Sequence, residues 1–553
     1  MPLGTNFSPQ TSKINPKILS KSLSFVHNLG VRIPTKRVVV MVMTALGGTR
    51  SMAANTAQHA DDERRLAELG YKQQFERKWS GFSNFAVSFS IISILSGCFT
   101  TFSQAWNNGG PVAISIGWPI IASLILIIGF CMAELVSAMP TAGGIYYWSL
   151  KLGKPVHGWL TGWLNLVGLV AVIAGVDYGF ATFFTFTVSL FNPAWSIENL
   201  SLVFIVFLVT VITHVMINVF GAKIIHWMQN VNVYWHVVGV AAIVLILVFI
   251  PEQHQSLEWM FTTQINNSGW TSYWFYVLPL GFLLTQYTIT GFDASAHVSE
   301  ETSNASIAAA KGIWQSIFYA GIGGWILLLS MLYAATNVEE INKNFGFSPI
   351  VLLTSLPQNF AVTVLVISLV GQYLCGMSCV TAASRMLFAF SRDGAVPGSN
   401  WLKKVDGNKN PSNAAVGAAA AAIVLTLPAL YAPEGTVVPV AFFAVTSVTV
   451  IGLFVSFAIP IFLRWRMGDK FQQGPWNLGN KWKWMAPIAV LEIAIISIYF
   501  MLPTTPAGMP GNENFTWLAF QYSPVAMLIV IGGAMIWWFA GARKWFKGPK
   551  SDL

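Results

Sequence analysis

Few ionisable side chains lie deep inside the long apolar stretches of this sequence. Among them are Glu134, Asp177, His214, His236, Asp293 and Glu492. A charge at the depth of a bilayer is expensive, and the side chains that carry one there usually bind a substrate or ion, relay a proton or pair with each other. These residues could therefore bind a cation or transfer a proton.

Asp177 stands near the middle of one apolar stretch, between Gly175 and Gly179. Two small residues four positions apart let a neighbouring backbone approach closely, and the carboxylate needs a hydroxyl, a cation or a proton as its partner. Two interpretations stay open. Asp177 is either a counter-charge for a substrate amine or a proton site, or it is a hydrogen-bonded packing carboxylate. The other three carboxylates are expected to have structural partners.

Glycines inside two apolar stretches mark places where a helix can unwind. Gly97 lies near the midpoint of the stretch 83–106, and Gly291 lies in the stretch 274–297. An unwound helix leaves N–H groups that can hold an anion and C=O groups that can hold a cation. Two such breaks would suit a zwitterion, which carries both charges.

The composition decides the class of protein. The chain has 553 residues, of which 54% are hydrophobic and 10% are charged, whereas a soluble domain carries about 25% charged residues. A soluble enzyme, a disordered chain and a secreted disulfide scaffold are excluded. A protein that crosses the membrane many times remains. The net charge of +9 is explained by basic cytoplasmic loops, so nucleic acid is not expected as a partner.

The sequence holds few motifs for catalysis or metal binding. The four cysteines, Cys98, Cys131, Cys375 and Cys379, form no CxxC or Cys/His cluster, and no metal site is predicted. We find no GxxxxGK[ST] phosphate loop, no HExxH motif and no paired carboxylates on adjacent turns. The chain is therefore expected to be no enzyme, to have no catalytic residues and to use no cofactor.

Twelve segments satisfy the requirement of about 20 apolar residues for a helix that crosses the bilayer. They are 83–106, 112–138, 157–190, 200–220, 226–250, 274–297, 313–336, 360–390, 413–432, 437–463, 484–503 and 521–542. With the N-terminus inside, eighteen lysines and arginines fall on the inner side, and Lys343 alone falls on the outer side. This bias predicts twelve transmembrane helices with both termini in the cytoplasm. Helices 1–5 and 6–10 then start in opposite directions, as an inverted repeat requires.

We divide the chain into four parts. Residues 1–60 form a basic arm with seven basic residues and no Asp or Glu, which we interpret as disordered. Residues 61–80 form a cytoplasmic or interfacial segment, 81–545 the twelve-helix transporter domain, and 546–553 a cytoplasmic tail. The composition of the arm also fits a transit or signal segment, and the natural start could instead be Met41, Met43 or Met52.

Four regions carry a family resemblance. They are 69–73 together with 82–97, then 133–148, 290–302 and 383–397. In these regions the chain resembles the amino acid–polyamine–organocation (APC) superfamily of permeases. More narrowly, it resembles the amino acid/choline/4-aminobutyrate (GABA) permease branch, which includes the plant bidirectional amino acid transporters. The resemblance covers roughly residues 70–550.

The resemblance implies an all-α, LeuT-like membrane fold of two inverted five-helix repeats plus two helices, with the first and sixth helices unwound near the membrane centre. It implies a substrate site at these two breaks, where the backbone N–H groups of Ser96, Gly97 and Cys98 hold the carboxylate and the carbonyl groups of residues 287–290 hold the amine. An aromatic side chain of the sixth helix would close the site. Loops 299–302 and 391–397 would have structural or gating roles. The implied site residues are Ser93, Ser96, Gly97, Cys98, Tyr287, Thr288, Thr290, Gly291 and Phe292, to which we add Asp177.

His236 departs from the pattern of the family. Proton-coupled members often carry a lysine in the fifth helix, fifteen residues after the glycine of a Gly-x-Lys start, and here Gly221 and Lys223 place His236 at that position. A histidine, with a reference pKa of about 6.5, could cycle a proton there. Alternatively it is neutral and hydrogen-bonded to a backbone carbonyl of the first or the eighth helix. We expect a proton, and not sodium, as the coupling ion.

The sequence thus predicts a secondary transporter of amino acids or GABA in the cell membrane, in which helices 1, 2, 6 and 7 rock against the rest. A choline or polyamine permease and an exchanger without a coupling ion are the alternatives, ahead of a channel or a membrane enzyme. Asp177 in the cavity would favour a substrate with a distant amine, such as GABA. The expected partners are this small molecule and the lipid bilayer, and the oligomeric state is not predicted.

Overall fold

The computed structural model describes residues 59–431 and 440–548. Nearly all of the predicted arm, the last five residues of the predicted tail and the segment 432–439 lie outside the described residues. From Asp62 onward, the described residues form one compact unit. The segment 61–80 before the first span is helical over residues 61–68.

Helices account for the regular structure of the described residues, in which the only β-type pairs are two isolated bridges, Trp79 with Thr302 and Asn108 with Asn266. The long helices, together with the two pieces of the first span, are α3 (Gly81–Ile91), α4 (Ile94–Thr100), α6 (Trp118–Ala138), α8 (Pro155–Ser189), α9 (Leu200–Phe220), α10 (Ala222–Phe249), α15 (Ala305–Ala334), α18 (Gln358–Arg392), α20 (Ser412–Thr426), α21 (Val440–Met467), α22 (Trp482–Tyr499) and α23 (Ser523–Trp537).

Shorter helices connect or interrupt these spans. They are α5 (Phe102–Asn107), α7 (Gly144–Leu152), α11 (Leu257–Thr262), α12 (Leu278–Gly281), α13 (Leu283–Thr288), α14 (Ala294–His297), α16 (Val338–Lys343), α17 (Ser348–Ser355), α19 (Ser399–Leu402) and α24 (Arg543–Trp545). Two π-helical turns, η1 (Ala113–Gly117) and η2 (Tyr273–Val277), lead into α6 and α12.

Eleven helical segments of the described residues are long and apolar enough to cross a bilayer, and they match eleven of the twelve predicted spans. The sixth predicted span, 274–297, is divided among η2, α12, α13 and α14. Each of these helices is therefore too short to cross a bilayer alone. The prediction of an all-α polytopic membrane protein is confirmed. The count of twelve crossings and the inverted repeat stay predictions.

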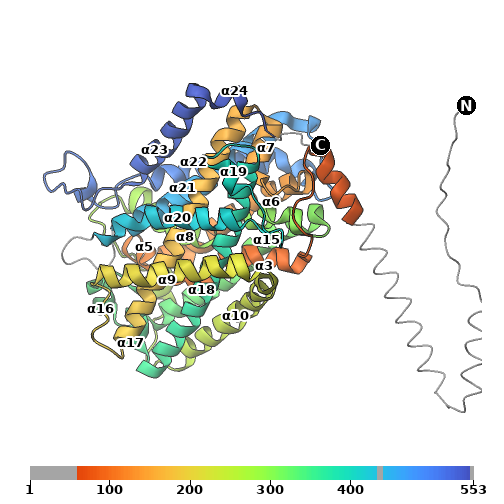
Figure 1. The fold of residues 1–553 in the computed structure, drawn as a ribbon. Helices are drawn as coiled ribbons and strands as arrows, with labels where there is room; N and C mark the ends of the chain where they lie inside the picture. Colours follow the sequence, from red (N-terminus) through yellow and green to blue (C-terminus); the bar gives the residue numbers. More distant parts are fainter. Residues whose placement is uncertain (1–58, 432–439, 549–553) are drawn as a thin grey trace, which may run out of the picture. The chain divides into compact units, whose positions relative to one another are not determined.

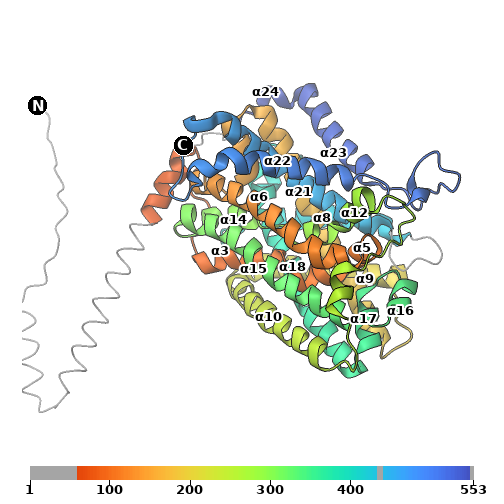
Figure 2. The ribbon, with the colours of Figure 1, turned by 180° about the vertical axis from the view of Figure 1, so that it is seen from behind.

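Burial separates central helices from peripheral ones. In an apolar stretch of 18 residues, 83% of the residues are buried in α8, against 33% in α10 and 17% in the last span, which contains α23. α8 packs against α7, α9, α18, α20 and α21, whereas α10 and α23 lie at opposite edges of the unit in both views (Figure 1, Figure 2). A helix that is apolar on all sides and buried inside a bundle has this position, so α8 is the central element on which the candidate site is built.

Candidate substrate and proton site

The first span is broken between α3 and α4, and Gly97, where the sequence predicted the break, lies inside α4. Ser93, with φ −14° and ψ 95°, begins α4, and its Oγ and carbonyl oxygen both accept from the amide of Ser96. The amide of Gly97 also donates to the carbonyl of Ser93, at 2.9 Å. The first N–H groups of a helix have no intrahelical acceptor, and here they belong to Ile94 and Leu95. The amides of Ser96 and Gly97, which the resemblance assigned to the substrate carboxylate, are instead bonded to Ser93, and the N–H groups left open for an anion are those of the first two residues of α4.

The sixth span is broken between α13 and α14, over residues 289–293. Gly291 has φ +83°, a conformation that glycine adopts readily and other residues avoid. Carbonyl groups in the last turn of α13 have no following helical turn to bond them. The break therefore exposes backbone acceptors for a cation at the position that the sequence predicted for unwinding.

The two breaks lie against each other. A Cβ atom added to Gly97 would overlap the side chain of Thr288, and one added to Gly291 would overlap Ile91. The hydroxyl of Ser88 on α3 donates to the carbonyl of Phe292, at 2.8 Å. The structure therefore brings together the predicted residues of the first and sixth helices, with the N-terminus of α4 close to the C-terminus of α13.

Several polar groups at these breaks lack a partner in the described part of the chain. The hydroxyls of Ser96, Tyr287 and Thr290 are buried without a hydrogen bond. Buried polar groups in native proteins are nearly always satisfied, so unsatisfied ones require an explanation. Their position beside the two helix ends is compatible with a polar ligand.

The predicted aromatic residues have different surroundings. The hydroxyl of Tyr287 lies close to α8, because a Cβ on Gly175 would stand 2.6 Å from it. Phe292 is fully buried and packs on Phe454 and Phe457 of α21, with ring centroids 6.1 and 5.2 Å away. Tyr287 therefore lies between the breaks and α8, whereas Phe292 anchors the sixth span to α21.

His236 on α10 reaches the break of the first span. Its Nε2 lies 2.8 Å from Oγ of Ser93, and its Nδ1 lies 2.9 Å from the carbonyl oxygen of Asn232. Since a carbonyl can only accept, Nδ1 carries the hydrogen, and in the neutral ring Nε2 accepts from the hydroxyl of Ser93. A proton added to Nε2 would reverse this bond and leave the hydroxyl hydrogen of Ser93 without its acceptor.

Asp177 pairs with a residue that the sequence did not assign to it. Its Oδ2 lies 3.2 Å from Nδ1 of His214 on α9, and both side chains are fully buried. A Cβ on Gly376 of α18 would overlap its other carboxylate oxygen. The carboxylate therefore lies among α8, α9 and α18.

The direction of Asp177 follows from the helix geometry. Gly175 and Gly179 of the same helix face Tyr287 and Thr100, which belong to the broken spans. Residues two apart on a helix point about 200° apart. The structure thus places Asp177 against His214 and away from the contacts with the two breaks.

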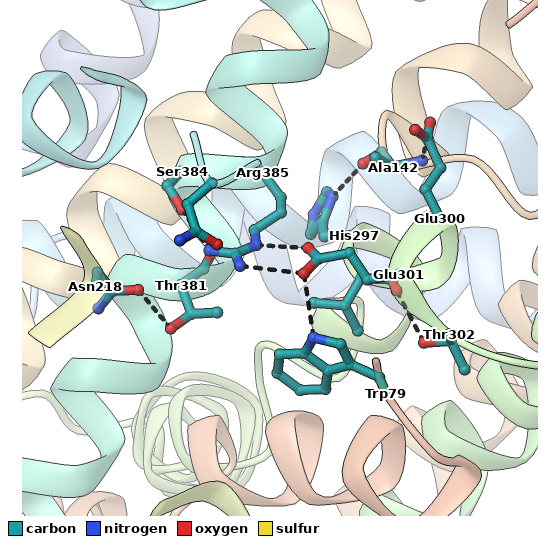
Figure 3. Close-up of polar contacts among 12 residues, drawn as sticks. Trp79, Ala142, Asn218, His297, Glu300, Glu301, Thr302, Thr381, Ser384 and Arg385 are labelled. Carbon is teal, nitrogen blue, oxygen red and sulfur yellow. Dashed lines mark hydrogen bonds and ion pairs between the residues drawn. The ribbon is translucent and has the colours of Figure 1, made fainter. Parts of the chain in front are cut away.

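A polar network ties three segments together at the end of the bundle where α3 begins and α14 ends. Glu301 lies between two donors, as Figure 3 shows: Nε of Arg385 on α18 at 2.9 Å and Nε1 of Trp79 at 3.1 Å. The neighbouring Glu300 pairs with Arg392 at 3.1 Å and accepts from the amide of Ala142 at 2.9 Å. The chain before α3 and the chain after α14 are therefore both bound to α18.

A second cluster continues this network. Oδ2 of Asp393 accepts from the hydroxyls of Tyr71 and Tyr146, each at 2.9 Å, and the guanidinium of Arg392 lies 4.0 Å from the ring of Tyr71. Burial raises the pKa of Asp393, although Arg392 and the two hydroxyls act in the opposite direction. Tyr71 thus attaches the segment before α3 to the end of α18.

The family profile described as amino acid permease matches residues 80–535 of the chain. The chain belongs to this amino acid permease family. The permease is 34% identical to the amino-acid permease BAT1 of Arabidopsis thaliana, over 88% of this chain and 96% of that relative. It is 35% identical to the BAT1 homolog of Oryza sativa subsp. japonica, over 88% and 95%. The GABA-specific permease of Saccharomyces cerevisiae is 28% identical, over 90% and 87%. The predicted family resemblance is confirmed.

The remaining intramembrane carboxylates of this permease have partners, as the sequence led us to expect. Glu134 pairs with Arg464 of α21 at 2.9 Å. Asp293 accepts from Asn165 at 3.1 Å, and the same oxygen lies 3.1 Å from Nε2 of His297. Glu492 accepts from Gln286 of α13. The contacts of Glu134, Glu492 and Asn165 link helices that are distant in the sequence, whereas His297 is four residues from Asp293.

Sequence reasoning overlooked His297 and the pairing of His214. The only available signal for His297 was its spacing of four residues from Asp293, which puts both on one helix face. No spacing relates Asp177 to His214, because they are on different helices. The permease therefore contains two buried Asp–His contacts, of which neither was predicted.

Proposed function

We propose that this permease is a secondary active carrier of amino acids or GABA that works by alternating access and couples substrate movement to a proton at His236. The single observation that carries the proposal is the meeting of the two helix breaks, Gly97 against Thr288 and Gly291 against Ile91. This arrangement offers N–H groups and C=O groups to the two ends of one zwitterion.

The proposed proton step uses the contact between His236 and Ser93. Ser93 begins α4 and holds the amide of Ser96. A proton on Nε2 of His236 removes the acceptor of the Ser93 hydroxyl, so the protonation state is linked to the first turn of α4. A ligand or proton can drive a conformational change only if it interacts differently with the two states, and this contact supplies such a difference.

The proposed movement is a rocking of the first, second, sixth and seventh spans against the others. The contacts of Glu301 with Arg385 and of Asp393 with Tyr71 would then form and break in each cycle at the cytoplasmic end. Asp177 is turned to His214, so an α-amino acid is supported as well as GABA. This leaves no specific support for choline or a polyamine.

Uptake into proteoliposomes tests the proposal. The substrates are GABA, choline, putrescine, glutamate, arginine and a neutral amino acid, each with and without an inward proton gradient. We expect the gradient to stimulate uptake of GABA or another amino acid. Uptake only into preloaded vesicles would replace coupling by exchange, and sodium-dependent uptake without pH dependence would contradict the role of His236.

A further inference from the structure

A groove opens between α10 and α15 beside the break of the first span. Its volume is about 640 Å³, and Phe89 of α3 and Ile94 of α4 line it together with the two long helices. Twelve of its fourteen lining residues are apolar, and His236 and Tyr319 are the other two. The histidine that bonds to Ser93 is therefore part of the groove wall.

The groove is continuous with the apolar outer surface of the two helices. Val237, Leu245 and Ile322 line it and are 61%, 56% and 47% exposed. Both α10 and α15 are long and apolar enough to cross a bilayer, so the medium at this surface is lipid hydrocarbon. We propose that one acyl chain of a membrane phospholipid occupies this groove and packs against the break of the first span.

The dimensions fit one chain of one leaflet. The lining residues of α10 run from Val233 to Leu245, which is about 18 Å along a helix, and half of the hydrocarbon core is about 15 Å. Leu245 is four residues from the Phe249 end of α10, whereas Val233 is eleven residues from its start. On α10 the lining therefore lies nearer to the Phe249 end than to the start of the helix.

Small side chains create the depth of the groove. Ala241 of α10 and Gly323 of α15 both line it, and a Cβ on Gly323 would stand 3.1 Å from Ile94. Lipid tails are as apolar as these walls, so the attraction comes from close packing and not from exclusion of water. A larger side chain at Ala241 would take the space of the acyl chain.

The seated chain touches elements that move apart in the proposed transport cycle. α3, α4 and α15 belong to the rocking bundle, whereas α10 belongs to the rest. This consequence rests on the proposed function: a chain that packs here holds the two parts in the arrangement described above and borders His236. Occupancy of the groove is therefore linked to the rate of transport.

Native mass spectrometry of the full chain in detergent, after loading with phosphatidylcholine, tests the binding. We expect the wild type to retain one more phosphatidylcholine than Ala241→Phe. Val238→Phe is the matched control, since Val238 is on the same helix, is 67% exposed and does not line the groove. It should retain the lipid. Ile326→Trp fills the opposite wall and replaces Ala241→Phe if that variant does not fold. Equal retention in wild type, the filled variant and the control would overturn the proposal.

Transport measured on the same variants separates this inference from the proposed function. We expect Ala241→Phe to change the maximal uptake rate by about fivefold or more, the lower range of allosteric coupling, and Val238→Phe to leave it unchanged. Lipid retention does not require transport. Loss of retention without any change in rate would refute the link to the cycle, and absence of uptake in every protein would refute only the proposed function.

Discussion

The hydroxyl of Ser93 serves two neighbours, the ring of His236 and the amide of Ser96. Replacing His236 by Gln keeps a polar side chain but removes the titrating group, so we expect the stimulation of uptake by an inward proton gradient to disappear while exchange between preloaded vesicles continues. The ratio of uptake with and without the gradient measures this. His254→Gln is the control, because His254 follows the end of α10 and stacks on Tyr333. A His236→Gln variant that still responds to the gradient would exclude His236 as the coupling residue.

Asp177 and His214 form a contact that is closed to solvent. Substitutions of these two residues test whether the contact is structural. Removing one partner of a buried polar contact leaves the other group without a hydrogen bond, at a cost of about 1–3 kcal/mol and more for a charged group. We expect His214→Leu to lower the thermal unfolding midpoint more than the double variant Asp177→Asn/His214→Leu, because the double variant has no carboxyl group to leave unpartnered. Additive effects of the two substitutions would show that the pair is not coupled. If Asp177→Asn binds GABA more weakly but binds α-amino acids as the wild type does, the Asp177 carboxylate belongs to the substrate site after all.

At the scale of elements, the break of the sixth span depends on Gly291. It combines a positive φ of +83° with contact to Ile91. Gly291→Ala is expected to cost about 2–5 kcal/mol, the sum of the backbone and overpacking terms, and to abolish uptake. Gly398 has φ +73° and nothing within 4 Å of an added Cβ. Gly398→Ala should therefore cost only about 1–2 kcal/mol and leave uptake unchanged. Thermal unfolding and uptake at equal protein content distinguish the two, and equal losses would refute the packing role of Gly291.

Glu301 connects the segment before α3 and the segment after α14 with α18. Arg385 and Glu301 are 4% and 9% exposed, so Glu301→Gln leaves a buried guanidinium unpaired and should cost about 3–5 kcal/mol. The matched control is Glu339→Gln, whose partner Lys343 is 61% exposed, and surface pairs contribute about 0–1 kcal/mol. The shift of the unfolding midpoint in detergent measures both. A Glu301→Gln shift as small as that of the control would mean that this contact does not hold the segments together.

At the scale of the whole molecule, the number of crossings decides on which side the two ends lie. Eleven helical segments in the described part of the chain are long enough to cross, and the divided span 274–297 makes an even count if it also crosses. We expect the N-terminal and C-terminal ends on the same, cytoplasmic side. Fluorescent tags at each end, quenched from outside sealed cells, test this. Quenching of one tag alone would give an odd number of crossings and remove the inverted repeat.

The sequence by itself determined the architecture of this permease, because lipid imposes demands that composition must meet. Long apolar runs, few charges and the bias of lysine and arginine predicted the helical membrane fold. Gly291 marked the break of the sixth span, because unwinding favours the residue without a side chain. The break of the first span lies before α4, whereas Gly97 is inside that helix and allows the close approach of Thr288. The four matching regions predicted the family.

Only the tertiary structure decided which side chains meet. Asp177 with His214, Ser93 with His236 and Glu301 with Arg385 are separated by 37, 143 and 84 positions. Their helices are apolar on almost every face, so the periodicity that reveals the inner face of a soluble helix is weak here. Whether Asp177 faces the breaks or turns away depends on the rotation of α8 against its neighbours. That rotation is set by packing, which a single sequence does not encode in any local pattern.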